Sequence, residues 1–354
     1  MSSYPPLRIS VPASTANLGP GFDIWGIALD LRNEFVCTRA ARNDGSLRLS
    51  FQTGDAKTVP VSSLPKKTDA DNLFIKTYNY LIKKAGQTPL SYDVNIVVNV
   101  PFSRGLGSSS TAILAGLTLA NETLRREYQL AYRIEQILEF ALEFEPHPDN
   151  LTAALYGGWN LCLPKITALI GETAGSSKDK KGTVPSNTAV PQSPLEDGPS
   201  FMRLPMKVRA PIQIAGVIPD LKLETRDSRQ LIPVTVSRSD LIFQTSRVAA
   251  LVALLNEEKL SAAHKTAFRT AMEDRMHTSQ RAHLIPEMFQ IFEDWYTEGA
   301  LGCFLSGAGS TLLAFWPSSI DVSQLDLAKR FTAKKIQATQ RAFQLDSHGL
   351  MLLS

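Results

Sequence analysis

Pro101–Ala112, with the sequence PFSRGLGSSSTA, joins a predicted strand to a predicted helix and decides the fold. Tyr92–Val100 alternates apolar and polar residues, which predicts a strand that Pro101 ends. Thr111–Ala120 is apolar nearly all round, which predicts a buried helix. A glycine-rich turn at a helix N-terminus presents unpaired N–H groups to an anion. The segment therefore predicts a phosphate-binding loop, and a plain glycine-rich turn is the alternative.

The residue types inside this loop suit a nucleotide triphosphate. Gly105 and Gly107 let the backbone approach phosphates without an intervening Cβ. The hydroxyls of residues 108–110 can bond phosphate oxygens or Mg²⁺. The spacing differs from a Walker A loop, no lysine follows, and the GxGxxG pattern of dinucleotide-binding proteins is absent.

A second polar loop, Glu145–Asn150 with the sequence EPHPDN, follows the amphipathic helix predicted at Ile134–Leu142. Mg²⁺ prefers hard oxygen ligands, typically one or two carboxylates together with phosphate. Glu145 and Asp149 are both candidates for that role. The alternative is an ordinary helix break, in which Asp149 caps a short helix ending at Tyr156.

Two more glycine turns complete the set. In Asn17–Asp23 (NLGPGFD), Asn17 and Asp23 could orient a small polar substrate, or they could form Asx turns around the glycines. Ser306–Ser310 (SGAGS) lies between strands predicted at Gly302–Leu305 and Thr311–Trp316, where a hairpin turn is the alternative.

The rest of the chain predicts a mixture of strands and helices without internal repeats. Strands are expected at Leu7–Val11, Arg48–Gln52 and Ile212–Ile218, and a strand or hairpin at Ile24–Thr38. Arg48–Gln52 is expected to pair with Ile24–Thr38, and Pro12–Phe22 is expected to be a loop. Helices are expected at Asp71–Lys84 (with Asn72 as a cap), Ser239–Asn256, Ala262–Thr278, Pro286–Thr297 and Ser323–Phe343.

Composition narrows the class of protein. With 354 residues the chain is long enough for two domains. Its formal charge of +3 and the absence of a dense basic run argue against a nucleic-acid or membrane partner. Three widely spaced cysteines suggest neither disulfides nor zinc. No signal-peptide pattern and no apolar run of 18 residues is present, so we expect a cytoplasmic protein. Residues 171–200 lack aromatic, Ile and Met residues and predict a flexible insertion.

Together, these loops resemble those of the GHMP kinases, a family of small-molecule kinases. Pro101 and the Gly-Leu-Gly-Ser-Ser run at 105–109 are similar to the family's nucleotide loop, and Ser306–Ser310 is similar to its late glycine motif. Within the family, the homoserine kinases are most similar. Val11–Asp23 resembles their opening signature and His147–Asn150 their HxDN element. Glu224–Pro233 resembles ETxxxRxxLP, and Asp274–Arg281 resembles DxxHxxxR. The resemblance runs from about Leu7 to Phe315.

The resemblance implies a role for each matched residue. ATP would be bound by Pro101, Arg104, Gly105, Leu106, Gly107, Ser108, Ser109, Ser110, Ser306 and Gly307. Ser109 and Glu145 would hold Mg²⁺. The substrate, L-homoserine, would be surrounded by Asn17, Asp23, His147, Asn150, Thr225, Arg229 and Arg281. The two arginines would clamp its carboxylate, since a guanidinium matches a carboxylate with two hydrogen bonds. Asp23 and Asn150 would act in catalysis by orienting the hydroxyl, without a dedicated base.

The resemblance also implies a two-domain α+β fold with the site between the domains. A ribosomal-protein-like, ATP-binding domain would span residues 1–170 and a ferredoxin-like domain residues 201–354, with the insertion at 171–200 between them. The expected reaction is ATP-dependent phosphorylation of L-homoserine by a homodimer. The alternatives are a GHMP kinase acting on another alcohol, such as mevalonate, and an inactive ligand sensor on the same fold.

Overall fold

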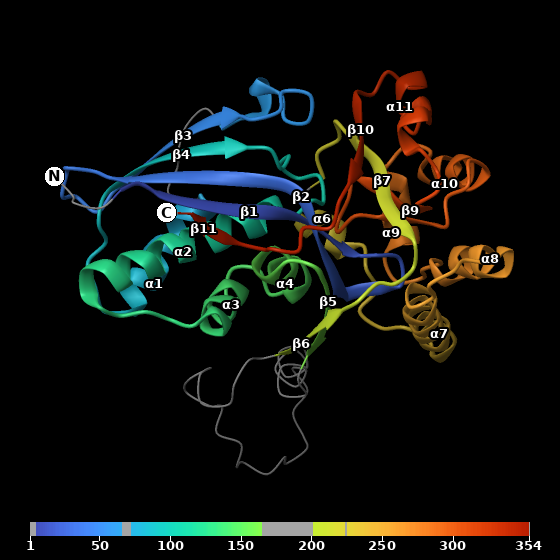
Figure 1. The fold of residues 1–354 in the computed structure, drawn as a ribbon, viewed down its shortest axis with the longest axis horizontal. Coiled ribbons are helices and arrows are strands. Elements are labelled where there is room, and N and C mark those ends of the chain that lie inside the picture. Colours follow the sequence, from blue (N-terminus) through green and yellow to red (C-terminus); the bar gives the residue numbers. More distant parts are fainter. Residues whose placement is uncertain (1–4, 66–71, 165–200, 224, 354) are drawn as a thin grey trace, which may run out of the picture.

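The computed structural model describes residues 5–65, 72–164, 201–223 and 225–353, and it contains two β-sheets (Figure 1). The side chains of Pro164, Thr225 and Arg226 also lie outside the description, as does the insertion expected at 171–200. The α+β fold class is confirmed by these two sheets and the helices packed on them.

The larger sheet has seven strands. They are β1 (Leu7–Asn17), β2 (Gly21–Arg39), β3 (Leu47–Thr53), β4 (Tyr92–Val98), β5 (Trp159–Pro164), β6 (Phe201–Met206) and β11 (Met351–Leu353). Their order is β11-β1-β2-β4-β3, while β5 pairs with β2 and β6 pairs with β5. Strand β3 pairs with β4 in parallel, so the expected pairing of Arg48–Gln52 with Ile24–Thr38 is wrong. The edge of β2 is already occupied by β4.

Helices α1 (Leu73–Lys84), α2 (Ser108–Tyr128), α3 (Ile134–Leu142) and α4 (Pro148–Tyr156) lie on one side of this sheet (Figure 1). Asn72 caps α1 as expected, because its side chain accepts a hydrogen bond from Phe74 N. Buried apolar residues of α1–α4 and of strands β1–β4 form one continuous core. This core fixes the start of α2, which follows the glycine-rich loop directly.

The smaller sheet has the strand order β10-β7-β9-β8 and is antiparallel throughout. Its strands are β7 (Ile212–Pro219), β8 (Gly302–Leu305), β9 (Leu312–Pro317) and β10 (Ala338–Phe343). Numbered along the chain, that order is 4-1-3-2, the ferredoxin-like arrangement that we expected. The helices of this half are α6 (Thr225–Gln230), α7 (Arg238–Leu255), α8 (Ala262–Ala271), α9 (Thr278–Arg281), α10 (Met288–Thr297) and α11 (Lys329–Ala333).

Three predicted elements are wrong in extent or type. Ser323–Phe343 is not one helix: it contains the short helix α11 and then β10, whose pairing with β7 from Ala338 to Phe343 outweighs local helix propensity. Pro12–Phe22 is not a loop, because β1 continues to Asn17 along β2 and only Leu18–Pro20 turn. The helix expected to reach Thr278 ends at Ala271.

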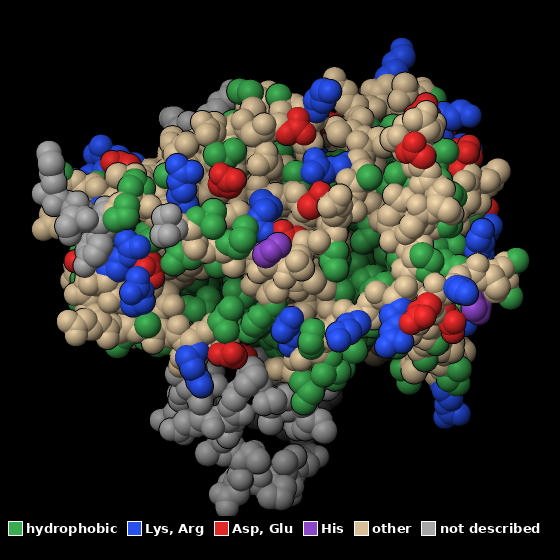
Figure 2. Space-filling view, in the orientation of Figure 1, with side chains coloured by type: hydrophobic (Ala, Val, Ile, Leu, Met, Phe, Trp, Pro, Cys, Tyr) green, Lys and Arg blue, Asp and Glu red, His purple; other side chains and the backbone are tan. Residues whose placement is uncertain are grey.

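The two sheets meet through a shared apolar core. Trp159 packs edge-on against Trp25 and stacks on Phe315, with ring centroids 6.1 and 5.6 Å apart. Strands β6 and β11 belong to the larger sheet although they follow residue 200, and the domain boundaries at 170 and 201 stay a prediction. No helix in the described part of the chain is long and apolar enough to cross a membrane. Acidic and basic side chains are interspersed over the face shown in Figure 2.

Candidate active site

The loops predicted to carry the chemistry meet in one cleft between the two sheets, with about 960 Å³ of open space. The cleft is lined by Asn17, Asp23, Ser103, Arg104, Gly105, Gly107, Ser108, Ser109, Ser110, Glu145, His147, Asp149, Asn150, Arg229, Arg281, Gly307 and Ala308. Most of the predicted site residues therefore border one space, although they lie in six separate parts of the sequence.

The glycine-rich loop presents the N-terminus of α2 to this cleft. Gly107 is the N-cap residue, in the left-handed conformation with φ +71°, and no described side chain caps the helix. The first N–H groups of α2 are thus open to a ligand, and the dipole of the 21-residue helix favours a negative charge there. No acidic residue occupies the first turn.

Close packing explains why glycine is needed in this loop. A Cβ on Gly105 would lie 2.1 Å from Ser306 O, and a Cβ on Gly107 would lie 2.0 Å from Ser14 Oγ. Both residues also have positive φ values near 70°. The loop therefore lies directly against the Ser306–Ser310 turn on one side and against β1 on the other.

Hydrogen bonds join the Ser306–Ser310 turn to both neighbouring loops. Ser306 Oγ lies 2.6 Å from Gly105 O and 2.7 Å from Thr15 Oγ1, and its side chain is buried. Gly307 N donates to Ala16 O at 3.1 Å, and Thr311 N donates to Arg104 O at 3.1 Å. This turn of the smaller sheet consequently positions the phosphate loop and β1 of the larger sheet.

The substrate loop, residues 17–23, has an unusual backbone. Asn17, Leu18 and Asp23 have φ values of 75°, 47° and 60°, a region that non-glycine residues seldom adopt. Asn17 Nδ2 donates to Gly307 O at 2.9 Å, while Asn17 Oδ1 accepts from Asp23 N at 3.1 Å. Such conformations persist where surrounding contacts determine them, and they cluster at functional sites.

The two predicted clamp arginines differ in their partners. Arg229, on α6, forms a two-pronged ion pair with Asp23, with N–O distances of 2.8 and 2.9 Å. Arg281 is 1% exposed and donates from Nε to Ser228 O and from Nη1 to Gly307 O. No carboxylate among the described residues lies within ion-pair distance of Arg281. Burial and the charge of Arg229 lower the pKa of Arg281 to about 10, and the charges of Asp23, Asp274 and Asp149 offset this only in part.

The acidic side of the cleft is formed by the start of α4. Glu145 pairs with His147 Nδ1. Asn150 Oδ1 accepts from Ser14 Oγ at 2.8 Å, which ties α4 to β1. Asp149 is 3% exposed, and burial together with the charge of Asp23 raises the pKa of Asp149 to about 7. A buried carboxylate with a raised pKa beside a cleft is a common feature of catalytic sites.

Three predicted ligands among the described side chains, Pro101, Leu106 and Ser306, do not line this cleft. Leu106 and Ser306 are buried in the protein interior, and the side chain of Thr225 lies outside the described residues. Pro101 instead borders a second pocket, which shares Arg104 with the cleft and includes Lys57, Phe102, Ile218 and Lys222. Arg104 is buried and pairs with Asp220 at 2.5 Å.

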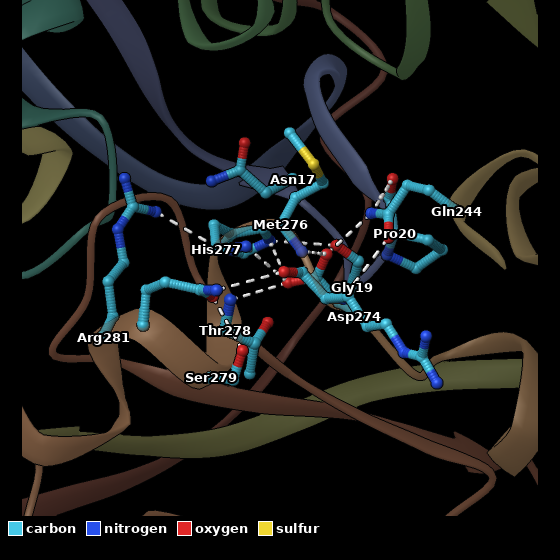
Figure 3. Close-up of polar contacts among 12 residues, drawn as sticks. Asn17, Gly19, Pro20, Gln244, Asp274, Met276, His277, Thr278, Ser279 and Arg281 are labelled. Carbon is cyan, nitrogen blue, oxygen red and sulfur yellow. Dashed lines mark hydrogen bonds and ion pairs between the residues drawn. The ribbon is translucent and has the colours of Figure 1, made fainter. Parts of the chain in front are cut away.

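Two features of the site do not follow from the sequence pattern. The pattern suggests Asp149 only as a magnesium ligand or a helix cap, although it assigns the adjacent Asn150 to the substrate. It includes Asp274 and His277 only as parts of the DxxHxxxR element. Figure 3 shows that they lie against the substrate loop, where His277 Nε2 is 2.9 Å from Gly19 O. The spacing of His277 and Arg281, four residues apart, is the signal that both belong to one site.

Comparisons with known proteins agree on a single family. The family model described as "GHMP kinases N terminal domain" matches residues 72–158. The chain is 31% identical over 345 residues to a homoserine kinase of Halothermothrix orenii, covering 97% of this chain and 95% of that protein. It is 33% identical over 356 residues to a homoserine kinase of Trichormus variabilis, covering 99% of each.

Solved structures give the same fold. The crystal structure of a homoserine kinase from Cytophaga hutchinsonii matches this chain with a TM-score of 0.74 at 22% identity. The match covers 100% of this chain and 99% of that one. A mevalonate kinase structure matches 97% of this chain, and is itself fully covered, with a TM-score of 0.60 at 12% identity. At these identities the structures establish the fold alone.

Proposed function

The chain belongs to the homoserine kinases of the GHMP kinase family, and on that premise we propose that it transfers the γ-phosphoryl group of ATP to the side-chain hydroxyl of L-homoserine. The product is O-phospho-L-homoserine, a precursor for threonine. The observation that carries the proposal is the pairing, in one cleft, of an uncapped helix N-terminus with the buried guanidinium of Arg281, which has no ion-pair partner among the described residues. The first suits phosphate and the second suits the carboxylate of an amino acid.

ATP would lie along the glycine-rich loop. Its phosphates would bind the N–H groups that follow Gly107 and the hydroxyls of Ser108–Ser110, which border the cleft. The second pocket, lined by Pro101, Phe102 and Ile218, is contiguous with the loop and would take the base and ribose. Arg104 borders both spaces, so it would lie beside the phosphates.

Two donors that line the cleft fit Mg²⁺. The carboxylate of Glu145 and the hydroxyl of Ser109 border the same cleft as the start of α2, and Mg²⁺ commonly takes one carboxylate together with phosphate oxygens. Ser109 and Glu145 would hold the ion, which when bound neutralises charge on the phosphates. His147 orients Glu145 through the hydrogen bond between its Nδ1 and the carboxylate.

The amino-acid end of homoserine would bind at the arginines. Arg281 would pair with the substrate carboxylate, which supplies the anion that the buried guanidinium lacks. Arg229 is already paired with Asp23, so its contribution to substrate binding is the smaller one. Thr225 is the first residue of α6, the helix that carries Arg229, and it would be a further substrate ligand.

The hydroxyl end would be oriented by Asn17, Asp23 and Asn150. The hydroxyl oxygen forms a bond to the γ-phosphorus as the bond to the bridging oxygen of ADP breaks, and the hydroxyl proton leaves on a phosphate oxygen. We propose that no dedicated base is required, because Asp23 is neutralised by Arg229. Asp149, with its raised pKa, is the competing candidate for a base.

The cysteines bear on the compartment in which the enzyme works. Cys37, Cys162 and Cys303 are buried and free, which suits a reducing cytoplasm. A homodimer and two domains divided at 170 and 201 are proposed from the family resemblance.

The test is an ADP-release assay with Mg-ATP and a panel of alcohols: L-homoserine, L-serine, L-threonine, mevalonate and galactose. We expect turnover on L-homoserine well above every other alcohol. Turnover on mevalonate instead would keep the kinase activity and reject homoserine as the substrate, while turnover on galactose, which carries no carboxylate, would reject the assignment of Arg281. ATP binding without turnover of any alcohol would favour an inactive sensor.

A further inference from the structure

His277 touches both ends of the proposed homoserine site with one buried imidazole ring (Figure 3). Nε2 lies 2.9 Å from Gly19 O, in the loop that carries Asn17 and Asp23. Nδ1 lies 3.3 Å from Nη1 of Arg281, the proposed carboxylate ligand. The ring therefore spans from the part of the site that orients the hydroxyl to the part that binds the carboxylate.

The two contacts determine the protonation state of the ring. A backbone carbonyl only accepts a hydrogen bond, and a guanidinium only donates one, so Nε2 carries the proton and Nδ1 does not. Burial acts in the same direction, because it lowers the pKa of His277 and favours the neutral ring. The carboxylate of Asp274, 3.4 Å from Nε2, lies on the side of the protonated nitrogen.

Asp274 fixes the turn from which His277 projects. Its buried carboxylate accepts hydrogen bonds from the backbone N–H groups of Met276, His277 and Thr278, at 2.9, 2.9 and 2.6 Å. It also accepts from Gln244 Nε2 at 2.6 Å, and the same nitrogen lies 2.8 Å from Pro20 O. The ring is thus anchored on its own chain while Gln244 holds the neighbouring residue of the substrate loop.

We propose that His277 is a positioning residue for the phosphoryl transfer: as a neutral ring protonated on Nε2, it sets the distance between the substrate loop and the guanidinium of Arg281. This inference rests on the proposed function, since the distance matters only for a substrate that carries a carboxylate and a reacting hydroxyl. The contact with Gly19 would affect kcat, because that loop orients the reacting hydroxyl. The contact with Arg281 would affect KM for homoserine, because Arg281 binds the substrate carboxylate.

The alternative is that His277 only fills space. Its ring packs on Phe22, with centroids 5.3 Å apart, and a packing residue would affect stability without separating the two kinetic constants. Two amide substitutions distinguish a positioning role from a packing role. Asparagine reproduces the acceptor at Nδ1, and glutamine reproduces the donor at Nε2. His277→Asn keeps the contact with Arg281, and His277→Gln keeps the contact with Gly19.

The experiment measures kcat, both KM values and the melting temperature of the full chain for each variant. We expect His277→Asn to lower kcat roughly tenfold with little change in KM for homoserine, and His277→Gln to raise that KM roughly tenfold with a smaller change in kcat. KM for ATP should stay constant in both. His283→Gln is the matched control, because His283 is exposed and lies two residues beyond Arg281.

Parallel changes of kcat and KM in both variants, or a loss of stability alone, would overturn the proposal. Nitrogen chemical shifts of the imidazole rings in the parent protein give a second readout, which requires no variant to fold and no turnover. A His277 ring protonated on Nε2 alone supports the proposed contacts with Gly19 and Arg281, and a ring protonated on Nδ1 contradicts them. Absence of homoserine turnover in the parent would instead reject the proposed function and leave the ring assignment standing.

Discussion

Asp23 and Arg229 are 206 residues apart in the chain, yet they form a two-pronged ion pair at the edge of the cleft, with N–O distances of 2.8 and 2.9 Å. Asp23 comes from β2 of the larger sheet, and Arg229 comes from α6 beside the smaller one. The carboxylate of the substrate loop is therefore already paired with a cation before a substrate enters.

This pairing predicts a modest effect of Asp23→Asn. An asparagine keeps the shape of the side chain and can still accept a hydrogen bond, so kcat for homoserine should stay within about tenfold of the parent if Asp23 only orients the hydroxyl. Steady-state kinetics with saturating Mg-ATP measure this. A loss of several orders of magnitude would show that Asp23 accepts the proton.

Substitution of the arginines should have unequal effects. Arg281→Lys loses the planar, two-pronged donor where the substrate carboxylate is the missing counter-ion, and we expect KM for homoserine to rise roughly 10- to 100-fold. Arg229→Lys retains a charge beside Asp23 and should raise that KM less. KM for ATP serves as the internal control in both variants. Equal effects would mean that both arginines contact the carboxylate.

The buried carboxylate of Asp149 predicts a dependence of stability on pH. Folding raises its pKa from 3.8 to about 7, so the folded state binds this proton more tightly. The resulting stabilisation is present below pH 4 and is lost as pH rises through 7. We expect the melting temperature of the parent to fall by a few degrees more than that of Asp149→Asn between pH 5 and pH 8. Parallel melting curves for the two proteins would contradict this.

The same variant separates the two catalytic schemes. If Asp149 is only a buried neighbour of Asn150, Asp149→Asn should keep kcat within about tenfold, whereas removal of a general base typically costs 10²- to 10⁴-fold. The pH profile of kcat gives an independent check. An acidic limb near pH 7 that disappears in the variant would assign the base to Asp149.

Two glycines with the same backbone conformation predict different outcomes on conversion to alanine. Gly86 has φ +70°, and apart from its chain neighbours no described atom lies within 4 Å of the place that a Cβ would take, so Gly86→Ala should cost only about 1 kcal/mol in stability and leave KM for ATP unchanged. Gly105→Ala places a Cβ 2.1 Å from Ser306 O, so it must displace the phosphate loop and raise KM for ATP more than tenfold. Unchanged ATP binding in Gly105→Ala would show that this loop does not bind the nucleotide.

The local parts of the site could be predicted from sequence because each is a short, self-contained pattern. Gly105 and Gly107 indicate a loop that needs positive φ, and the residues around Asn150 follow a compact motif. The pairing of Arg229 with Asp23 could not be predicted, because it depends on how the two sheets pack. Nor could the raised pKa of Asp149, which arises from burial after folding.

The errors in secondary structure also arise where contacts between distant parts of the chain decide the outcome. Residues 338–343 form β10 because the edge of β7 is available to them from Pro219 to Ile214, a partner more than 100 residues earlier in the chain. Helix propensity within Ser323–Phe343 carries no information about that edge. Residues 13–17 extend β1 for a similar reason, because β2 folds back along them.

Strand β11 has a consequence for how the protein is made. It pairs with β1 from Arg8 to Ser10, so a strand near the start of the chain depends on one near residue 352 for its outer partner. During synthesis that stretch of β1 remains an open edge until nearly the whole described chain has left the ribosome. Open edges pair readily with other chains. The nascent protein thus has a built-in period of vulnerability to aggregation, which ends when β11 docks.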